Sequence, residues 1–313
     1  MIISIGECMV ELARGHDGRF GLAYGGDTFN TAVYLARTGQ RVAYATALGD
    51  DGYSDGIVKL AADEGVSTEL VNRVSGRMPG LYLIETTAAG ERTFHYWRES
   101  SPARELFDGA YGATVAAAMK AARLVCFSGI TLSLYSPAGL DRFTSALAAA
   151  RSAGARIAMD GNYRPRGWGG DAARACGVME RFWRLADVAL PTFDDEAALW
   201  RDATPAATIA RLAGFGVGEI VVKNGRAGAI VLADGARRDV PCPDKIAALD
   251  TTAAGDSFNA GYLARRLAGD SAVAAAVFGH RLAGVVIQHR GAIVPRAATA
   301  TVTDQSAHRD AAR

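Results

Sequence analysis

The chain has 313 residues, half of them hydrophobic, and a formal net charge of +1 at pH 7. This length and composition can bury a large core, in one large α/β domain or two smaller ones. The near-zero net charge argues against a dedicated nucleic-acid-binding or membrane-binding protein, so we expect neither partner.

The four cysteines are scattered along the chain, without a CxxC pair or a histidine at metal-ligand spacing. This pattern argues against both a disulfide framework and a zinc site. An apolar run begins directly after Met1, so we expect no secretory leader. We therefore expect a cytoplasmic protein.

The N-terminal segment predicts a strand and then a helix that begins at a glycine pair. Ile2 to Ile5 is typical of a buried strand, and the polar stretch from Gly6 to Glu11 follows where that strand ends. Sites on open α/β sheets usually lie at such strand ends. Gly25 and Gly26 then open a helix that we expect to reach about Arg37. By itself this stretch could be a plain helix entry with a polar cap.

The next segments predict a strand, a turn and a helix, followed by a long hairpin. Residues 41–48 are typical of a strand, 49–52 of a turn and 53–64 of a helix. Between residues 80 and 98, two β-type runs flank a turn at residues 88–91. A hairpin of this length would project from the main sheet, and its exposed edges would need cover.

From about Tyr111 onward, helical and strand patterns alternate, which predicts an α/β fold with a mostly parallel sheet and helices on both faces. We see no internal repeat and no linker that would divide this core. The tail after Pro295 is polar and weakly periodic, so we expect residues 301–313 to be disordered. The expected strands lie at 123–128, 156–160, 187–190, 219–223 and 228–232, and the expected helices at 136–153, 171–185, from 204 onward, 255–267 and 271–288.

Residues 250–262 form the most informative stretch, in which a turn of small side chains runs directly into a helix. The N–H groups of a first helical turn have no intrahelical partner and carry the positive end of the helix dipole, so an anion can bind there. Asp256 lies at this point. It either caps the helix through its carboxylate, or acts as a general base on a hydroxyl that attacks a phosphoryl group.

The sequence DTTAAGDSFNAGYLA from Asp250 resembles the C-terminal signature of the ribokinase-like (PfkB) sugar kinases, usually DTxGAGD. Ala253 stands where most members carry glycine, an exchange that leaves the backbone donors in place. The resemblance implies a three-layer α/β/α core in one domain over residues 1–300, with a small β-sheet lid from about 11–24 and 74–103. In that family the lid is partly buried against a second subunit, so a homo-oligomer through the lid is expected.

The same resemblance assigns roles around the expected site. The family's GGxxxNxA stretch, whose glycine backbone and asparagine hold sugar hydroxyls, is matched by Gly26 and Asn30, with Asp27 between them. The residues implied at the phosphoryl group are Asp256 as the base and the backbone N–H groups of Ala253, Ala254 and Gly255.

The stretches GECMVEL, GLYLIET, GERTFHYWR and NYRPR further resemble a branch of the family that phosphorylates 2-keto-3-deoxygluconate, an acid sugar. An acid sugar presents a carboxylate that guanidinium groups bind bidentately, whereas a neutral hexose does not. By themselves the arginines could equally be surface residues that pack on aromatic rings. The substrate contacts implied are Tyr82, Tyr96, Arg98, Arg164 and the backbone carbonyl of Ile130.

The nucleotide is expected near a second turn. The stretch from Lys223 to Gly228 joins two strands through a glycine-rich turn, which by itself is an ordinary hairpin turn but can lie along a purine or phosphate. In the family, ATP lies along this turn and near the start of the last long helix. The residues implied for ATP are Asn162, Arg164, Lys223, Asn224, Gly225, Gly228 and His280, with Ala253, Ala254 and Gly255.

Charge on a transferred phosphoryl group must be neutralised, so Mg²⁺ is expected with ATP. Many relatives carry Asn-x-x-Glu at the helix start near Asp194, where the pair organises water around the metal. Glu196 matches the glutamate but Phe193 occupies the asparagine position, so Glu196 is expected to act only through water. The acidic residues there could instead compensate the helix dipole. The resemblance also allows a monovalent cation.

Together these features imply ATP-dependent phosphorylation of the terminal C6 hydroxyl of 2-keto-3-deoxygluconate, for sugar-acid catabolism. A PfkB kinase of a neutral sugar, such as fructose or ribose, would share Asp256 but need no paired arginines. A Rossmann-type oxidoreductase is disfavoured because the Gly25-Gly26 stretch is not GxGxxG. A silent nucleotide-binding regulator is disfavoured by the intact Gly255 and Asp256.

Overall fold

The computed structural model describes residues 1–15, 17–86 and 92–310. Among these, ten strands form one main sheet in the order β14-β13-β12-β11-β10-β9-β1-β4-β5, with β6 also paired to β4. All its pairings are parallel except β12–β13 and β13–β14. The strands are β1 Ile2–Ile5, β4 Val42–Leu48, β5 Val66–Ser67, β6 Val71–Arg73, β9 Leu124–Ser128, β10 Arg156–Asp160, β11 Val188–Ala189, β12 Glu219–Lys223, β13 Ala229–Ala233 and β14 Ala236–Val240.

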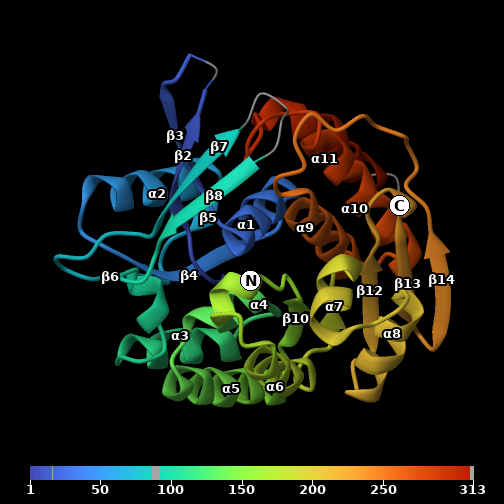
Figure 1. Ribbon diagram of the computed structural model, residues 1–313. Helices are drawn as coiled ribbons and strands as arrows, with labels where there is room; N and C mark the ends of the chain where they lie inside the picture. Colours follow the sequence, from blue (N-terminus) through green and yellow to red (C-terminus); the bar gives the residue numbers. More distant parts are fainter. Residues whose placement is uncertain (16, 87–91, 311–313) are drawn as a thin grey trace.

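Helices cover both faces of this sheet (Figure 1). Because side chains alternate along a strand, Ile3 packs with the α3, α5 and α6 side, whereas its neighbour Ile2 packs with the α1, α9 and α10 side. This arrangement confirms the predicted three-layer core. The helices are α1 Asp27–Arg37, α2 Gly52–Asp63, α3 Tyr111–Lys120, α4 Gly129–Leu134, α5 Pro137–Ser152, α6 Ala172–Trp183, α7 Phe193–Trp200, α8 Pro205–Gly214, α9 Ala254–Leu267, α10 Ala272–Val286 and α11 Arg296–Asp310, with short 3₁₀ turns η1 Pro102–Glu105, η2 Pro165–Trp168 and η3 Gly225–Ala227.

A second, four-stranded sheet stands apart from the helical layers (Figure 1). It has the order β3-β2-β7-β8, from β3 Phe20–Gly25, β2 Met9–Arg14, β7 Leu81–Thr86 and β8 Arg92–Trp97. Its inner face carries a small apolar cluster of Met9, Tyr82 and Ile84. The predicted small sheet is thereby confirmed, while the predicted hairpin turn at 88–91 lies outside the described residues.

The C-terminal tail differs from the expectation of disorder. Helix α11 spans Arg296–Asp310 and packs on α10 and α1. The reason is visible at Thr299 and Thr303, which are 1% and 8% exposed and so lie against the core despite their polarity. The structure therefore has a helix over Arg296–Asp310 where the sequence predicted disorder, and residues 311–313 lie outside the described part.

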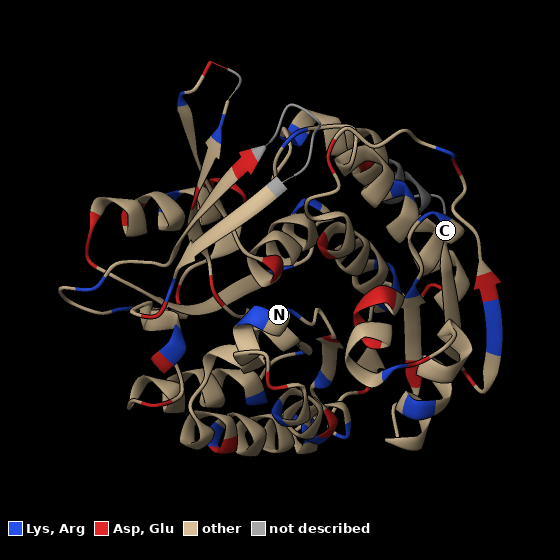
Figure 2. Ribbon diagram, viewed as in Figure 1, with Lys and Arg blue, Asp and Glu red and all other residues tan. Residues whose placement is uncertain are grey.

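Charged residues are distributed over both helical layers with their signs interspersed (Figure 2). Within the described residues, none of the helices combines the length and the apolar character needed to cross a bilayer.

Candidate active site

The candidate site lies where α9 begins, beside the carboxyl ends of the parallel strands. Ala253, the residue before α9, has a left-handed backbone with φ 59°, a conformation that glycine adopts more easily than alanine. No side chain caps this helix. The N–H of Ala254 donates to the carbonyl of Thr251 at 3.2 Å, whereas in the described residues the N–H groups of Gly255 and Asp256 have no partner. Of the expected backbone donors, the N–H of Gly255 is therefore free and that of Ala254 is engaged, and the free N–H of Asp256 lies next to them.

The carboxylate of Asp256 does not cap α9 but reaches across to α1. Its Oδ2 accepts a hydrogen bond from Nδ2 of Asn30 at 2.8 Å. Desolvation and, next, the charge of Asp27 raise the pKa of Asp256 to about 7, although the bond from Asn30 opposes the shift. The capping interpretation of Asp256 is therefore wrong, and its carboxyl is poised to exchange a proton near neutral pH.

Asp27, the first residue of α1, is held by two donors. Its Oδ1 accepts from the N–H of Thr28 at 2.8 Å and its Oδ2 from Nδ2 of Asn162 at 2.7 Å. Burial raises the pKa of Asp27, and these hydrogen bonds oppose the shift. Asn162 itself has φ 35°, a conformation that asparagine tolerates. The structure thus places the side-chain amide of Asn162 against Asp27, and its expected contact with ATP stays a prediction.

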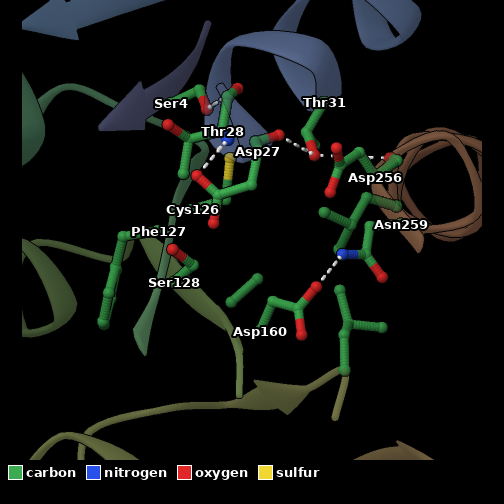
Figure 3. A pocket seen from close by; sticks show the side chains of 13 residues that line it. Ser4, Asp27, Thr28, Thr31, Cys126, Phe127, Ser128, Asp160, Asp256 and Asn259 are labelled. Atoms are coloured by element: carbon green, nitrogen blue, oxygen red, sulfur yellow. Dashed lines mark hydrogen bonds between the residues drawn. The ribbon is translucent and has the colours of Figure 1, made fainter. Parts of the chain in front are cut away.

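Lys223 ends β12 with a buried side chain that turns inward. Its Nζ donates to Oδ2 of Asp160 and to Oδ1 of Asn259, both at 2.9 Å, and Nδ2 of Asn259 donates to the same Asp160 oxygen at 2.6 Å. A Cβ placed on Gly255 would lie 3.5 Å from this Nζ, so the ammonium lies close to the first turn of α9. Figure 3 shows Asp27, Asp160, Asp256 and Asn259 around one pocket between α1 and α9.

The glycine pair before α1 has no room for side chains. A Cβ on Gly26 would overlap the backbone oxygen of Glu7, and one on Gly25 would lie 2.8 Å from the hydroxyl of Tyr82. The N–H of Gly26 lies 3.5 Å from Oδ1 of Asn30. The pair therefore lets the small sheet approach the residue that binds Asp256.

The small sheet presents an aromatic surface toward this pair. The rings of Tyr82 and Tyr96 have centroids 5.9 Å apart, and the hydroxyl of Tyr82 donates to the buried Glu11. The guanidinium of Arg98 lies 6.0 Å from the Tyr96 ring centroid and pairs with Glu7, which is 3% exposed. Tyr82, Tyr96 and Arg98 are thus neighbours on the small sheet, and their expected contact with a substrate stays a prediction.

Two other predicted substrate contacts have partners within the chain. Arg164 pairs with Asp195 through Nη1 and Oδ1 at 2.8 Å, and the carbonyl of Ile130 accepts from the hydroxyl of Ser133 at 2.7 Å.

Glu196 is fully buried and pairs with Arg211 at 2.7 Å. Burial raises the pKa of Glu196 to about 7, and Arg211 opposes that shift. Its role toward Mg²⁺ stays a prediction.

The predicted nucleotide turn is closed by a hydrogen bond from the N–H of Asn224 to the carbonyl of Gly228 at 2.8 Å. Gly228 has φ 98°, so a side chain would be strained there. Cys242, from the loop after β14, lies 3.6 Å from both the Gly225 carbonyl and Nδ1 of His280. The turn and His280 are thus linked, although they are far apart in the sequence.

Sequence reasoning missed several residues of this site. Asp160 and Asn259 hold Lys223, and Glu7 and Glu11 hold the lid residues. Two signals were available: Asp160 ends a predicted strand, and Glu7 and Glu11 belong to the polar stretch that follows the first strand. Neither signal says which partner each carboxylate has.

The pfkB carbohydrate kinase family matches residues 1–299 of the chain. The 2-dehydro-3-deoxygluconokinase of Escherichia coli K12 is 42% identical over 305 residues, which cover 95% of this chain and 98% of that protein. The crystal structure of the 2-dehydro-3-deoxygluconokinase of Thermotoga maritima has a TM-score of 0.83 at 22% identity and covers 97% of this chain and 99% of that one. A crystal structure of an E. coli protein in complex with ATP and Mg²⁺ has a TM-score of 0.84 at 21% identity, with 97% and 99% covered.

Proposed function

The chain belongs to the pfkB family of carbohydrate kinases, and we propose that it transfers a phosphoryl group from ATP to 2-dehydro-3-deoxygluconate. The acceptor in this proposal is the terminal C6 hydroxyl, and the product is the 6-phosphate of the acid sugar. The observation that carries the proposal is Asp256, a carboxylate with a pKa of about 7 beside the uncapped start of α9.

Asp256 acts as the general base. A carboxylate whose pKa lies near the working pH combines a large ionised fraction with a useful basicity. Asn30 holds the carboxylate through Oδ2, so the other oxygen remains for the substrate hydroxyl. The proton moves from that hydroxyl to Asp256 as the hydroxyl oxygen attacks the terminal phosphorus of ATP, and ADP leaves.

The start of α9 stabilises the charge on the transferred phosphoryl group. The free N–H groups of Gly255 and Asp256 and the positive end of the helix dipole favour an anion there. The ammonium of Lys223 lies beside Gly255 and adds positive charge, part of which its ion pair with Asp160 compensates. We assign to Lys223 the role of stabilising the transferred phosphoryl group. Its Nζ is held in position by hydrogen bonds to Asp160 and Asn259.

The acid sugar lies between the small sheet and α1. Gly26, Asp27 and Asn30 bind its hydroxyl groups near Asp256, and Tyr82, Tyr96 and Arg98 bind its other end. Arginines at the lid favour an acid sugar over a neutral one, because a neutral sugar offers no anion to a guanidinium group. The neutral-sugar alternative is therefore the weaker of the two.

The phosphates of ATP fit the start of α9, where small side chains leave the backbone donors accessible. The adenine lies by the turn from Asn224 to Gly228 and by His280. Mg²⁺, carried by the phosphates, would neutralise their charge. We propose that the metal enters with the nucleotide. Within the described residues no group of three or more acidic, histidine or cysteine side chains could hold a metal ion by itself. A need for a monovalent cation stays a prediction, which turnover with and without K⁺ would test.

We further propose that two copies of the chain associate through the outer face of the small sheet. Leu22 is 52% exposed and Trp97 57% exposed on that sheet, and Leu22 pairs with Leu12, which in turn pairs with Leu83. These side chains share one face, opposite to Tyr82, and a second copy would remove that apolar surface from water. Leu22→Asp should shift sedimentation from dimer to monomer. A monomeric wild type would contradict this proposal.

The proposed enzyme works in the cytoplasm. ATP is its phosphoryl donor, and its four cysteines are free, as is usual in a reducing compartment.

The reaction is tested by phosphorus and proton NMR of the product formed from 2-dehydro-3-deoxygluconate with Mg·ATP. We expect ADP and a phosphomonoester coupled to the terminal CH₂ protons. A phosphate on another carbon, or no consumption of the acid sugar, would contradict the proposed reaction.

A further inference from the structure

Two of the three arginines near the proposed acid-sugar site already have a carboxylate partner. Arg98 pairs with the buried Glu7, and Arg164 pairs with Asp195 at 2.8 Å. A guanidinium whose charge is compensated in this way attracts a further carboxylate less strongly. Binding an acid sugar therefore calls for another positive charge at the lid.

Arg166 supplies such a charge. Its guanidinium lies 5.5 Å from the ring centroid of Tyr96, the same ring that Arg98 approaches. One of its nitrogens, Nη1, donates to the backbone carbonyl of Phe94 at 3.3 Å. Within the described residues no carboxylate lies at ion-pair distance from Arg166. The exposed Glu99 feels its charge only weakly, since bonds to backbone N–H groups are the main cause of the lowered pKa of Glu99.

The backbone beneath Arg166 is well fixed. Arg166 belongs to the 3₁₀ turn η2, which Trp168 anchors with 1% exposure. The following Gly167 has no room for a side chain, since its Cβ would lie 2.8 Å from the hydroxyl of Ser133. The exposed guanidinium thus extends from a rigid turn of the core toward the small sheet.

Contacts lead continuously from Arg166 to the proposed base. Arg166 lies on Tyr96, and Tyr96 lies beside Tyr82 with 5.9 Å between ring centroids. The hydroxyl of Tyr82 faces Gly25, directly before the helix from which Asn30 binds Asp256. A six-carbon acid lying along this path would have its hydroxymethyl end at Asp256 and its carboxylate at the Tyr96 end.

We propose that Arg166 binds the carboxylate of the acid sugar and determines the preference for an acid over a neutral substrate. This inference rests on the proposed function. Arg98 completes the carboxylate site from the lid side, with Glu7 holding it in place. Arg164 belongs instead to the Asp195 side of the site.

The test compares Arg166→Gln with wild type on two molecules that differ only at C1. One is 2-dehydro-3-deoxygluconate, and the other is 3-deoxy-D-fructose, in which CH₂OH replaces the carboxylate. Loss of one charge-assisted contact should lower kcat/KM for the acid about 10- to 100-fold, mainly through KM. The inhibition constant of 3-deoxy-D-fructose against the acid should change less than about threefold. Arg166→Lys should recover part of the loss for the acid.

Arg174→Gln is the matched control. Arg174 is another exposed arginine on an aromatic ring, 5.5 Å from the centroid of Trp168, in the neighbouring α6. We expect wild-type values for it with both molecules. Equal losses for acid and neutral molecules in Arg166→Gln would show that Arg166 only fixes the lid and would overturn the inference, as would an unchanged KM for the acid. If the wild-type protein does not phosphorylate the acid sugar, the proposed function is refuted, and the inference with it.

Discussion

Asp256→Asn removes the proposed base while keeping its shape. The amide oxygen of an asparagine can still accept the hydrogen bond that Nδ2 of Asn30 now gives to Oδ2 of Asp256 at 2.8 Å. What disappears is the ability to take a proton from the attacking hydroxyl. General base catalysis contributes about 10²- to 10⁴-fold to a rate, which corresponds to about 3–5 kcal/mol of transition-state stabilisation. We therefore expect kcat to fall by that factor.

The same change should leave the nucleotide site and the fold intact. Asp256 carries a negative charge beside the proposed phosphate site, so its neutralisation should keep ATP affinity equal or make it slightly higher. Burial of a charged carboxylate costs free energy, and this cost is the main reason why the pKa of Asp256 rises to about 7. A neutral amide does not carry that cost, so Tm should be equal or higher. Steady-state ADP release, ATP titration calorimetry and thermal unfolding measure these three quantities.

Asp63→Asn is the control for this experiment. Asp63 pairs with Lys59 at 2.7 Å on the exposed surface of α2, a pair worth no more than about 1 kcal/mol, and it lies outside the proposed site. Its kcat should match that of wild type. Turnover of Asp256→Asn within tenfold of wild type would refute the assignment of the base.

Three further changes test the electrostatics and the backbone of the site. Desolvation, with the charge of Asp27 as the next cause, raises the pKa of Asp256 to about 7. Because the base must be ionised, kcat/KM should fall as the pH drops through 7 and level off above it. A flat profile between pH 5 and 8 would contradict this expectation. Lys223 lowers the pKa of Asp256, so Lys223→Met should move the midpoint of that profile to higher pH, and an unmoved midpoint would separate Lys223 from the base. Ala253→Gly relieves a left-handed alanine with φ 59° and should stabilise the protein by about 1 kcal/mol with unchanged kcat, which urea unfolding and ADP release can check.

The sequence was most informative where a feature depends on residues that are neighbours in the chain. The stretch around Asp256 predicted a helix start that binds an anion, and α9 begins there without a side-chain cap. The alternating patterns after Tyr111 predicted the parallel sheet, because hydrophobic period and turn residues are local properties. The glycine pair before Asn30 likewise predicted the start of α1.

Partners distant in the sequence could not be predicted in this way. Asn30 and Asp256 are 226 positions apart, and only the packed fold shows that they form a hydrogen bond. Similarly, nothing local indicates that Arg98 is paired with Glu7, or that Glu196 is paired with Arg211. These pairings decide which charges remain for a ligand, and they changed the interpretation of the arginines.

In the C-terminal tail, the sequence predicted less structure than the fold contains. Its polar residues predicted disorder, yet Thr299 is almost completely buried in α11. Burial of a threonine against α1 and α10 is a property of the tertiary structure, which a weakly periodic sequence does not reveal.

The most direct test of the acid-sugar assignment is the ratio of kcat/KM for 2-dehydro-3-deoxygluconate to that for fructose, measured by ADP release with Mg·ATP. We expect a ratio of at least about 100, since a bound carboxylate contributes charge-assisted hydrogen bonds that fructose cannot make. A ratio near or below one would keep the kinase fold and Asp256 but contradict the acid-sugar site.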